Sequence, residues 1–348
     1  MRILTLNLWH GLAPKGPSNF IHLESSYRRR RREERQIEVL KNTQADLLFF
    51  QEVNPLLKRS QNFATELQKQ AFTQHDLVGV KVKGLGWPWN LSSGLMTLVS
   101  RSLGPRDLGA RKLSGSKWSG EMNWLSWQWS ESRYAVFVEF QHSHWGRVLA
   151  VNCHLHHGLE LDEPLKRQIQ IMHEQGLLTS NAAADLKERL LQTNLRREQE
   201  ITKLLDEIEL IRERYNLVIM GGDFNFTPDS AAYSHVIQFG FQDLWKEKNR
   251  TENGGQTYDE TRNQASHIFA KRFPLTIETE DLSFSPKTRQ AVVDLLQAHE
   301  HRKRRIDYLF VRLNGPELRI KTVDLFAVPG HDDLALSDHF GVVAELEG

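Results

Sequence analysis

The sequence predicts an α/β protein in which two mixed β-sheets pack against each other and helices cover them. Short runs rich in β-forming residues recur from the first residues to the last. Helical segments interrupt these runs without the strict strand–helix alternation of a parallel sheet, which favours two packed mixed sheets. The sequence has no internal repeat, low-complexity tract or linker-like stretch. We therefore expect a single domain over residues 1–348, a length that a two-sheet architecture can accommodate.

The composition is that of a globular protein without a strong overall charge. Hydrophobic residues make up 39% and charged residues 26%, and the formal net charge is +1, so any polyanion would be bound by local patches. The lone cysteine, Cys153, excludes an internal disulfide and fits a reducing compartment. No apolar run reaches the ~18 residues of a membrane span, and Met1–Leu6 is too short for a signal sequence. We expect a cytoplasmic protein, or a secreted one if a leader has been removed.

The predicted elements follow from local patterns, taken in chain order. Residues 2–9 alternate and are rich in β-formers, and a loop with Gly11, Pro14, Gly16 and Pro17 follows them. Further strands are expected where short apolar runs occur, at 46–51, 76–82, 94–100, 134–140, 147–154, 217–220, 306–312 and 340–346. Helices are expected at 23–43, 55–70, 163–175, 182–214, 229–239 and 288–301.

The segment 159–215 is polar and helical in pattern, and its part 159–190 is longer than a connection between the His154 strand and the Asp223 strand requires. It contains the predicted helices 163–175 and 182–214, and apolar residues recur in the second at mixed spacings of three and four. We expect a helical insertion at about 159–190, at the rim of the active-site mouth. There it would restrict access, bind a membrane or mediate association.

Two polar residues occur in or next to the first predicted strands. Asn7 interrupts an apolar strand, and a buried asparagine must be hydrogen-bonded or coordinate an ion. Glu52 directly follows the run 46–51 and could hold Mg²⁺, which uses one or two protein carboxylates together with substrate phosphate oxygens. The alternatives are that Asn7 faces solvent and that Glu52 is an ordinary loop residue.

Three histidines gather at the end of the strand 147–154. Strand alternation places Asn152 and His154 on one face and Cys153 on the other. His156 and His157 would not converge with His154 on a zinc ion, and no further Cys or His cluster completes a tetrahedral site. We therefore interpret His154 as a site residue and the other two as loop residues.

Acidic residues follow or interrupt the later strands. Gly221 and Gly222 stop an apolar strand and allow a tight turn, beyond which Asp223 and Asn225 project together. Asp307 lies inside a strand-like run, where a carboxylate is costly unless it is paired.

The motif Ser337-Asp338-His339 supplies a partner for that acid. An Asp307–His339 pair would fix the imidazole orientation and favour its cationic form.

Six motifs span residues 7 to 339, and together they are far more specific than any one of them. They are Leu6-Asn7-Leu8-Trp9, Gln51-Glu52-Val53, Asn152-Cys153-His154-Leu155, Gly222-Asp223-Phe224-Asn225, Arg305-Ile306-Asp307-Tyr308 and Ser337-Asp338-His339. Their order resembles the endonuclease/exonuclease/phosphatase superfamily. These are Mg²⁺-dependent phosphoesterases that include deoxyribonuclease-like nucleases, inositol polyphosphate phosphatases and neutral sphingomyelinases. The resemblance implies a four-layer α/β sandwich with the site at one mouth of the two sheets.

The resemblance also implies residue roles on the metal and water side of the site. Glu52 would be the principal ligand of Mg²⁺, for which Mn²⁺ could substitute, with Asn7 beside it and Asp338 close to the metal. His339 would be the general base on the attacking water, and Asp307 would orient its ring.

The remaining implied roles concern the phosphate. Asp223 and Asn225 would position water and phosphate, and His154 would contact phosphoryl oxygens or assist the leaving group. The physical argument agrees, since in-line attack builds charge on oxygens that a cation and His donors can stabilise.

The substrate is indicated by weaker signals. His154 within Asn-Cys-His-Leu is similar to the sphingomyelinase and deoxyribonuclease-like branches, and Ser93-Gly94-Leu95 resembles a strand of sphingomyelinase-like members. We expect a phosphodiesterase acting on a lipid headgroup, with a nuclease acting on DNA or RNA as the alternative. An inositol-phosphate phosphatase ranks lower because the Arg-rich specificity pattern of such an enzyme is not found, and an inactive binding module ranks lower because the motif set is intact.

Aromatic and basic clusters offer further substrate contacts. If the tryptophans in the middle of the chain are exposed, they favour peripheral membrane contact or stacking on bases. If they fill the core, they favour neither. Six of them crowd the middle of the chain, namely Trp87, Trp89, Trp118, Trp124, Trp127 and Trp129. The runs Arg28–Arg32 and Arg302–Arg305 could grip phosphates, and the first could equally be a solvated helix face.

Overall fold

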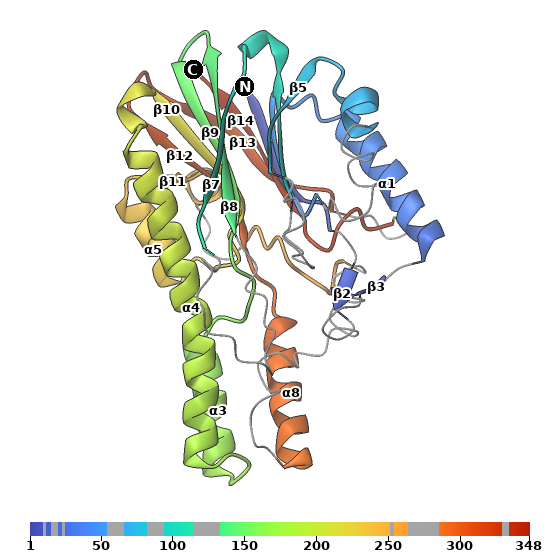
Figure 1. The fold of residues 1–348 in the computed structure, drawn as a ribbon, viewed down its shortest axis with the longest axis vertical. Coiled ribbons are helices and arrows are strands. Elements are labelled where there is room, and N and C mark those ends of the chain that lie inside the picture. Colours follow the sequence, from blue (N-terminus) through green and yellow to red (C-terminus); the bar gives the residue numbers. More distant parts are fainter. Residues whose placement is uncertain are drawn as a thin grey trace, which may run out of the picture.

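The structure is a computed structural model that describes residues 1–9, 12–14, 20–22, 25–53, 66–81, 94–114, 133–250, 254–263, 285–328 and 334–348. Two six-stranded mixed β-sheets face each other, and helices flank them (Figure 1). The predicted fold class is therefore confirmed. Among the described helices, none is both long and apolar enough to cross a membrane.

The first sheet joins the two ends of the described chain. Its strands, in spatial order, are β13 (Arg319–Phe326), β14 (Gly341–Glu347), β1 (Arg2–Asn7), β4 (Leu47–Gln51), β6 (Leu95–Ser100) and β5 (His75–Lys81). Strand β1 pairs antiparallel with β14 and parallel with β4. The amino group of Met1 donates to the carbonyl of Leu346 at 2.7 Å. Because Thr5 pairs with Val342, the end of β1 lies beside the start of β14.

The second sheet carries the middle of the chain. Its strands, in order, are β11 (Gln242–Asp243), β12 (Asp307–Leu313), β10 (Leu217–Asp223), β9 (Gly146–His154), β8 (Tyr134–His142) and β7 (Arg106–Lys112). Strand β10 is parallel to β9 and antiparallel to β12. This register sets Asp223 opposite His154 on one side and opposite Asp307 on the other.

Apolar side chains fill the space between the sheets, and polar contacts centred on Asn152 of β9 cross it to β4 and β6. The buried residues Phe49, Ala150 and Ile219 belong to this central cluster. A Cβ on Gly221 would lie 2.4 Å from the ring of Phe49, so the close approach of the sheets requires glycine there. The side-chain amide of Gln51 donates to Asn152 Oδ1 at 2.8 Å, which joins the site ends of β4 and β9.

Helices pack on both outer faces and complete four layers. The first sheet is covered by α1 (Ser26–Lys41), whose Leu40 joins a cluster with Leu4 and Phe50. The second sheet is covered by α5 (Ala231–Gln238) and by the second half of α4 (Ser180–Glu209). The short helix α6 (Leu244–Asn249) lies next to β13 and β12.

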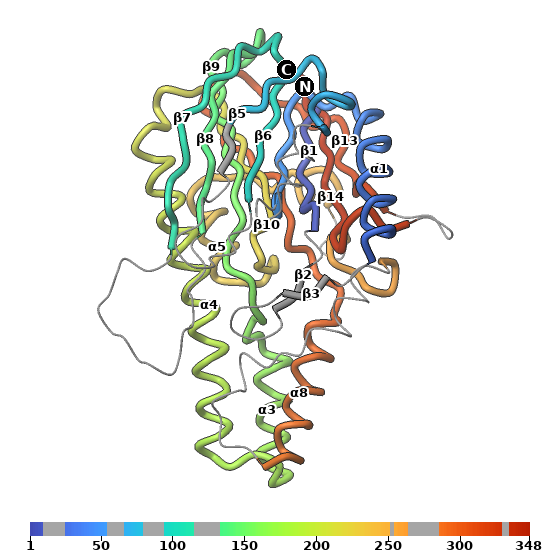
Figure 2. Tube along the Cα trace, turned by 45° about the vertical axis from the view of Figure 1, so that its right-hand side comes forward, coloured from blue at the N-terminus to red at the C-terminus, as the bar shows by residue number. Residues whose placement is uncertain are grey.

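Three helical segments extend beyond the sheets. They are α3 (Glu163–Glu174), the first half of α4, and α8 (Pro286–Glu300), which we call the helical extension. Their core includes Leu165, Leu186 and Leu296. The extension lies at the end of the sheets opposite the chain termini, and its helices run side by side (Figures 1 and 2). That it controls access to the site stays a prediction.

Several short or edge elements differ from those predicted. Residues 12–14 and 20–22 pair as a small hairpin of β2 (Leu12–Pro14) and β3 (Phe20–His22), although Gly and Pro residues predicted only a loop. The strands β7, β11 and β13, the helix α6 and the 3₁₀ turns Arg101–Leu103 and Arg212–Arg214 were not predicted. Of the predicted helix 55–70, the described part is helical at 66–71 and the remainder lies outside the described residues.

Candidate active site

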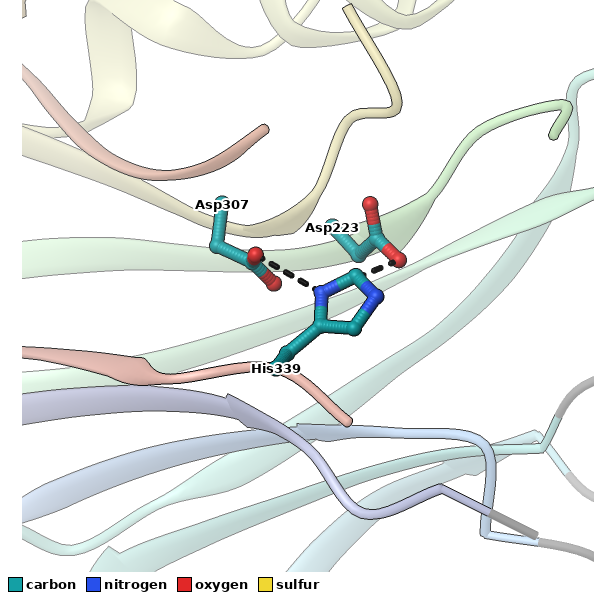
Figure 3. A group of neighbouring side chains, drawn as sticks. All are labelled: Asp223, Asp307 and His339. Carbon is teal, nitrogen blue, oxygen red and sulfur yellow. Dashed lines mark hydrogen bonds and ion pairs between the residues drawn. The ribbon is translucent and has the colours of Figure 1, made fainter. Parts of the chain in front are cut away.

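The centre of the site is a buried histidine held between two aspartates (Figure 3). His339 Nδ1 lies 2.9 Å from Asp307 Oδ2 and 3.9 Å from Asp223 Oδ2. Asp307 begins β12 and Asp223 ends β10, while His339 comes from the turn before β14. The pairing of Asp307 with His339 leaves the Nε2 atom of the ring for proton transfer.

Asp223 connects this pair to the other predicted residues. Its Oδ2 atom lies 3.4 Å from His154 Nε2 and accepts a hydrogen bond from Asn7 Nδ2 at 3.1 Å. The same Asn7 nitrogen donates to Glu52 Oε1 at 3.2 Å. The Asn7 amide oxygen instead accepts from the backbone N–H of Trp9 at 2.9 Å. Asn7 therefore bridges the two carboxylates through its nitrogen, which is not a metal-binding atom.

Two site residues have a backbone conformation that is uncommon outside glycine. Glu52 has φ 55° and Asn225 has φ 53°, both in the left-handed region. Such conformations often occur where a site requires a particular side-chain direction. Asn225 is fixed because its N–H donates to Asp223 Oδ1 and its side-chain Nδ2 donates to Leu155 O, each at 3.1 Å.

Glu52 is positioned by the strand that follows it in the sheet. The backbone N–H of Val53 donates to Gly94 O at 3.0 Å. A Cβ on Gly94 would lie 1.8 Å from Val53 O, so only glycine permits this approach. Close packing thus explains the glycine of the Ser93-Gly94-Leu95 motif. Ser93 itself lies outside the described residues.

The C-terminal motif is tied together locally. Ser337 Oγ donates to Asp338 Oδ1 at 3.3 Å and accepts from the backbone N–H of His339 at 3.1 Å. Asp338 and His339 are both buried. The structure thus brings the motifs from residues 7 to 339 to one end of the two sheets.

The buried charges shift the pKa values of the site. Burial and the neighbouring Asp307 raise the pKa of Asp223 to about 7. Burial alone would lower the pKa of His339, but the carboxylates of Asp307, Asp338 and Asp223 outweigh it and raise that pKa well above its ordinary range. The site therefore holds an excess of negative charge that favours a bound cation.

The donor set fits a divalent cation by its chemistry. Ligand atoms of Asp223, Asp307 and His339 all lie within 4.8 Å of one another. Asp307 Oδ1 is buried without a hydrogen-bond partner among the described residues, and the Glu52 carboxylate lies close by through Asn7. Carboxylate oxygens of this kind suit Mg²⁺ or Mn²⁺. The predicted ligands Glu52, Asn7 and Asp338 remain predictions.

Sequence reasoning missed a segment that braces the site. Thr257 Oγ1 accepts from the backbone N–H groups of Ile306 and Asp307, each at 3.1 Å. Thr257 O accepts from Phe340 N at 2.7 Å, on the other side of His339. The Tyr258 ring meets the His339 ring edge-on at 5.5 Å. This segment has no hydrophobic periodicity, so only its chain-distant contacts reveal its role.

The basic runs are largely engaged in structural contacts. Residues 302–305 form ion pairs, taken in order, with Asp162, Asp259, Glu300 and Asp243. In the other run Arg32 is buried, donates to Leu8 O at 3.0 Å and lies 4.8 Å over the Trp9 ring. The six central tryptophans lie outside the described residues.

The comparison with protein families identifies the chain. The sequence profile of the Endonuclease/Exonuclease/phosphatase family matches residues 4–339. The chain belongs to this family. Its members are phosphoesterases and nucleases that generally depend on divalent metal ions, and the chain has their fold. No curated protein matches the chain.

Solved structures share the family fold at low sequence identity. A structure of D. rerio TDP2 complexed with single strand DNA product has a TM-score of 0.56 and 14% identity, over 100% of this chain and 99% of that one. An endonuclease/exonuclease/phosphatase from Bacteroides vulgatus has a TM-score of 0.56 and 18% identity, covering 99% and 98%. A functionally unknown protein from Enterococcus faecalis has a TM-score of 0.57 and 17% identity, covering all of both chains. These likenesses concern the fold.

Proposed function

We propose that the protein is a divalent-metal-dependent phosphodiesterase that hydrolyses a P–O bond by in-line attack of water. The observation that carries the proposal is the buried Asp307–His339 pair, 2.9 Å apart, beside Asp223 and His154. A histidine fixed by a carboxylate is suited to move a proton between water and a reacting group. Family membership supports the same reaction class.

Each residue has a role that its contacts support. His339 takes the proton of the attacking water at Nε2, and Asp307 holds the ring through Nδ1. Asp223 and Asn225 position water and phosphate, and the His154 imidazole contacts a phosphoryl or leaving oxygen. Glu52 would hold the cation, which would supply positive charge to stabilise the phosphoryl oxygens.

The charge balance links Glu52 to His339. In the site without a cation, the surrounding carboxylates keep the pKa of His339 raised, so the ring stays protonated. A protonated ring cannot accept a proton. A cation held at Glu52 would offset this negative charge and lower the pKa of His339, which would favour the role of the ring as a base.

For the substrate class we favour a nucleic acid strand. The TDP2 structure with a single strand DNA product is a relative in fold whose own ligand is a nucleic acid. The prediction of a sphingomyelinase-like lipid substrate depends on two residues. The first is His154, which deoxyribonuclease-like members share, and the second is Gly94, whose presence is explained by close packing against Val53. A lipid headgroup remains the second candidate through the resemblance of the Asn152-Cys153-His154 motif.

A substrate panel tests the reaction and the substrate class together. Purified protein with Mg²⁺ is incubated in parallel with single-stranded DNA, single-stranded RNA, plasmid, sphingomyelin and lysophospholipid, each with an EDTA control. We expect metal-dependent cleavage of at least one nucleic acid. Cleavage of choline lipid alone would show that the substrate is a lipid. If no diester is cleaved in a metal-dependent way, the proposal is refuted.

His339→Ala tests the proton-transfer role. We expect turnover to fall by about 10²–10⁴-fold, the usual contribution of a general acid or base. His144→Ala is the matched control, because His144 is exposed in the β8–β9 turn at the opposite end of the sheet. Near-normal turnover in folded His339→Ala protein would remove His339 from the mechanism.

A further inference from the structure

The loop 155–161 leaves the site strand β9 and leads to the helical extension. Its first residue is tied to the site on both sides of its peptide unit. The backbone N–H of Leu155 donates to Asp223 O at 3.0 Å, and Leu155 O accepts from Asn225 Nδ2 at 3.1 Å. The loop therefore starts in a fixed position relative to the proposed phosphate-positioning residues.

Helix α4 fixes the loop again, on both sides of His157. The backbone N–H of His156 donates to Glu200 Oε2 at 2.7 Å. Arg197 NH1 donates to Gly158 O at 2.7 Å. Both α4 side chains are buried, with 0% and 1% of their surface exposed. Neither anchor involves the side chain of His157. The loop backbone is therefore held in place, and the His157 ring is left available for other contacts.

His157 is an exposed residue, and its ring contacts the site. It hydrogen-bonds to the Asn225 side chain. Because Asn225 Nδ2 is already donated to Leu155 O, the amide oxygen faces His157 and accepts its N–H. Burial on the protein side lowers the pKa of His157, despite the nearby Glu300, and this favours the neutral ring. A neutral ring that donates through one nitrogen carries a lone pair on the other.

That lone pair limits what His157 can bind. A phosphate oxygen is itself an acceptor, and a quaternary ammonium has no N–H to donate. A hydroxyl group can donate. In a nucleic acid strand, the hydroxyl next to a scissile phosphate is the ribose 2′-hydroxyl, which distinguishes RNA from DNA.

We propose that His157 is a substrate-contact residue that accepts a hydrogen bond from the ribose 2′-hydroxyl beside the scissile phosphate, so that the enzyme prefers RNA. This inference depends on the proposed phosphodiesterase function and adds a substrate preference to it. It uses a histidine that the reaction itself leaves without a role.

The test compares oligonucleotides of one sequence as RNA and as 2′-O-methyl RNA. The methyl group removes the donor and keeps the oxygen in place. We expect wild-type kcat/KM to be about tenfold higher for RNA, the size of one hydrogen bond. In His157→Phe that ratio should fall towards one, and His157→Gln, which keeps an acceptor oxygen, should retain part of it. His144→Phe, in the turn at the far end of β9, should keep the wild-type ratio.

The possible results separate this proposal from the phosphodiesterase proposal. A wild-type ratio near one, or an unchanged ratio in His157→Phe, would overturn the role of His157 while leaving the reaction class intact. If no strand is cleaved, the phosphodiesterase proposal is in question, and the affinities of both strands measured in EDTA still test His157. A hydroxyl preference seen only between phosphatidylglycerol and phosphatidylcholine vesicles would also overturn the assignment to RNA.

Discussion

Asp223 contacts residues from both sheets, and its buried negative charge is strongly disfavoured. Its carboxylate meets Asn7 from β1, His154 from β9 and the ring of His339. Burial and Asp307 raise its pKa to about 7. A buried carboxylate in such surroundings is disfavoured in its charged form unless a cation compensates it. The arrangement suits a reaction centre better than it suits stability.

Asp223→Asn should therefore stabilise the metal-free protein and inactivate the enzyme. The folded pKa of about 7 exceeds the unfolded value of 3.8, so the stability gained from proton binding is lost as pH rises through about 7. Asparagine has no proton to lose. We expect a higher free energy of unfolding in urea at pH 8 in EDTA, and turnover reduced by at least about 10²-fold. If Asp223→Asn instead lowered the free energy of unfolding, by equal amounts at pH 5 and pH 8, this account would be contradicted.

Helix α4 serves two parts of the molecule. Its second half packs Ile201 and Leu205 against the second sheet, and its first half packs Leu186 in the helical extension. Between these halves lie Arg197 and Glu200, which bind the loop 155–161. Movement of the helix would therefore move the loop that follows His154.

Arg197→Met tests this coupling. Methionine keeps much of the side-chain length but removes the donors to Gly158 O and Asn194 Oδ1. It also leaves the nearby Glu160 and Glu200 with one cation fewer. We expect a loss of about 3 kcal/mol in the free energy of unfolding, together with reduced turnover. Gln199→Met is the control, since Gln199 is exposed on the same helix, and an equal effect there would refute the proposed role.

How well each strand could be predicted from the sequence depends on how deeply the strand is buried. The central strands β4 and β10 are buried along their whole length, so they appear in the sequence as apolar runs. The edge strands β7 and β13 are partly exposed and polar, and they lack that signal. The hairpin of β2 and β3 occurs where Gly and Pro residues predicted a loop, because pairing and not composition defines it.

The site could be predicted where its residues end or begin central strands. Asp223 and Asp307 were recognisable because acids are unusual at such positions. Thr257 was not, because its contacts with Ile306 and Phe340 cross long stretches of sequence. Gln36 was missed for the same reason, although it donates to Leu8 O and to Leu336 O, which are far apart in the sequence.

The stability of the whole molecule should depend on pH through His156, which follows β9 and contacts Glu200 of α4 through its backbone N–H. Burial and the nearby Arg196 and Arg133 lower its pKa to about 2, whereas the unfolded value is 6.5. The unfolded chain therefore binds a proton below about pH 6.5 that the folded chain does not. Stability should fall as pH falls through this range, by up to about 1.4 kcal/mol per pH unit from this residue.

His156→Gln removes this titration and keeps the backbone contact with Glu200. We expect a shallower decline in the free energy of unfolding between pH 7 and pH 5 in EDTA. His144→Gln, at an exposed histidine, should leave the decline unchanged. Parallel declines in wild type and His156→Gln would show that this histidine is protonated in the folded protein.

The pairing of β1 with β14 has a consequence for synthesis of the protein. Asn7 is synthesised long before His339, and β14 lies between β13 and β1 in the finished sheet. Until β14 has emerged from the exit tunnel, β1 lacks one neighbour and His339, the proposed base, is not yet in place. A nascent chain thus carries Asn7 and Glu52, the proposed metal-side residues, without the proposed base. The proposed hydrolytic activity therefore depends on the pairing of β14 with β1, and a chain in which this pair has not formed holds only part of the site.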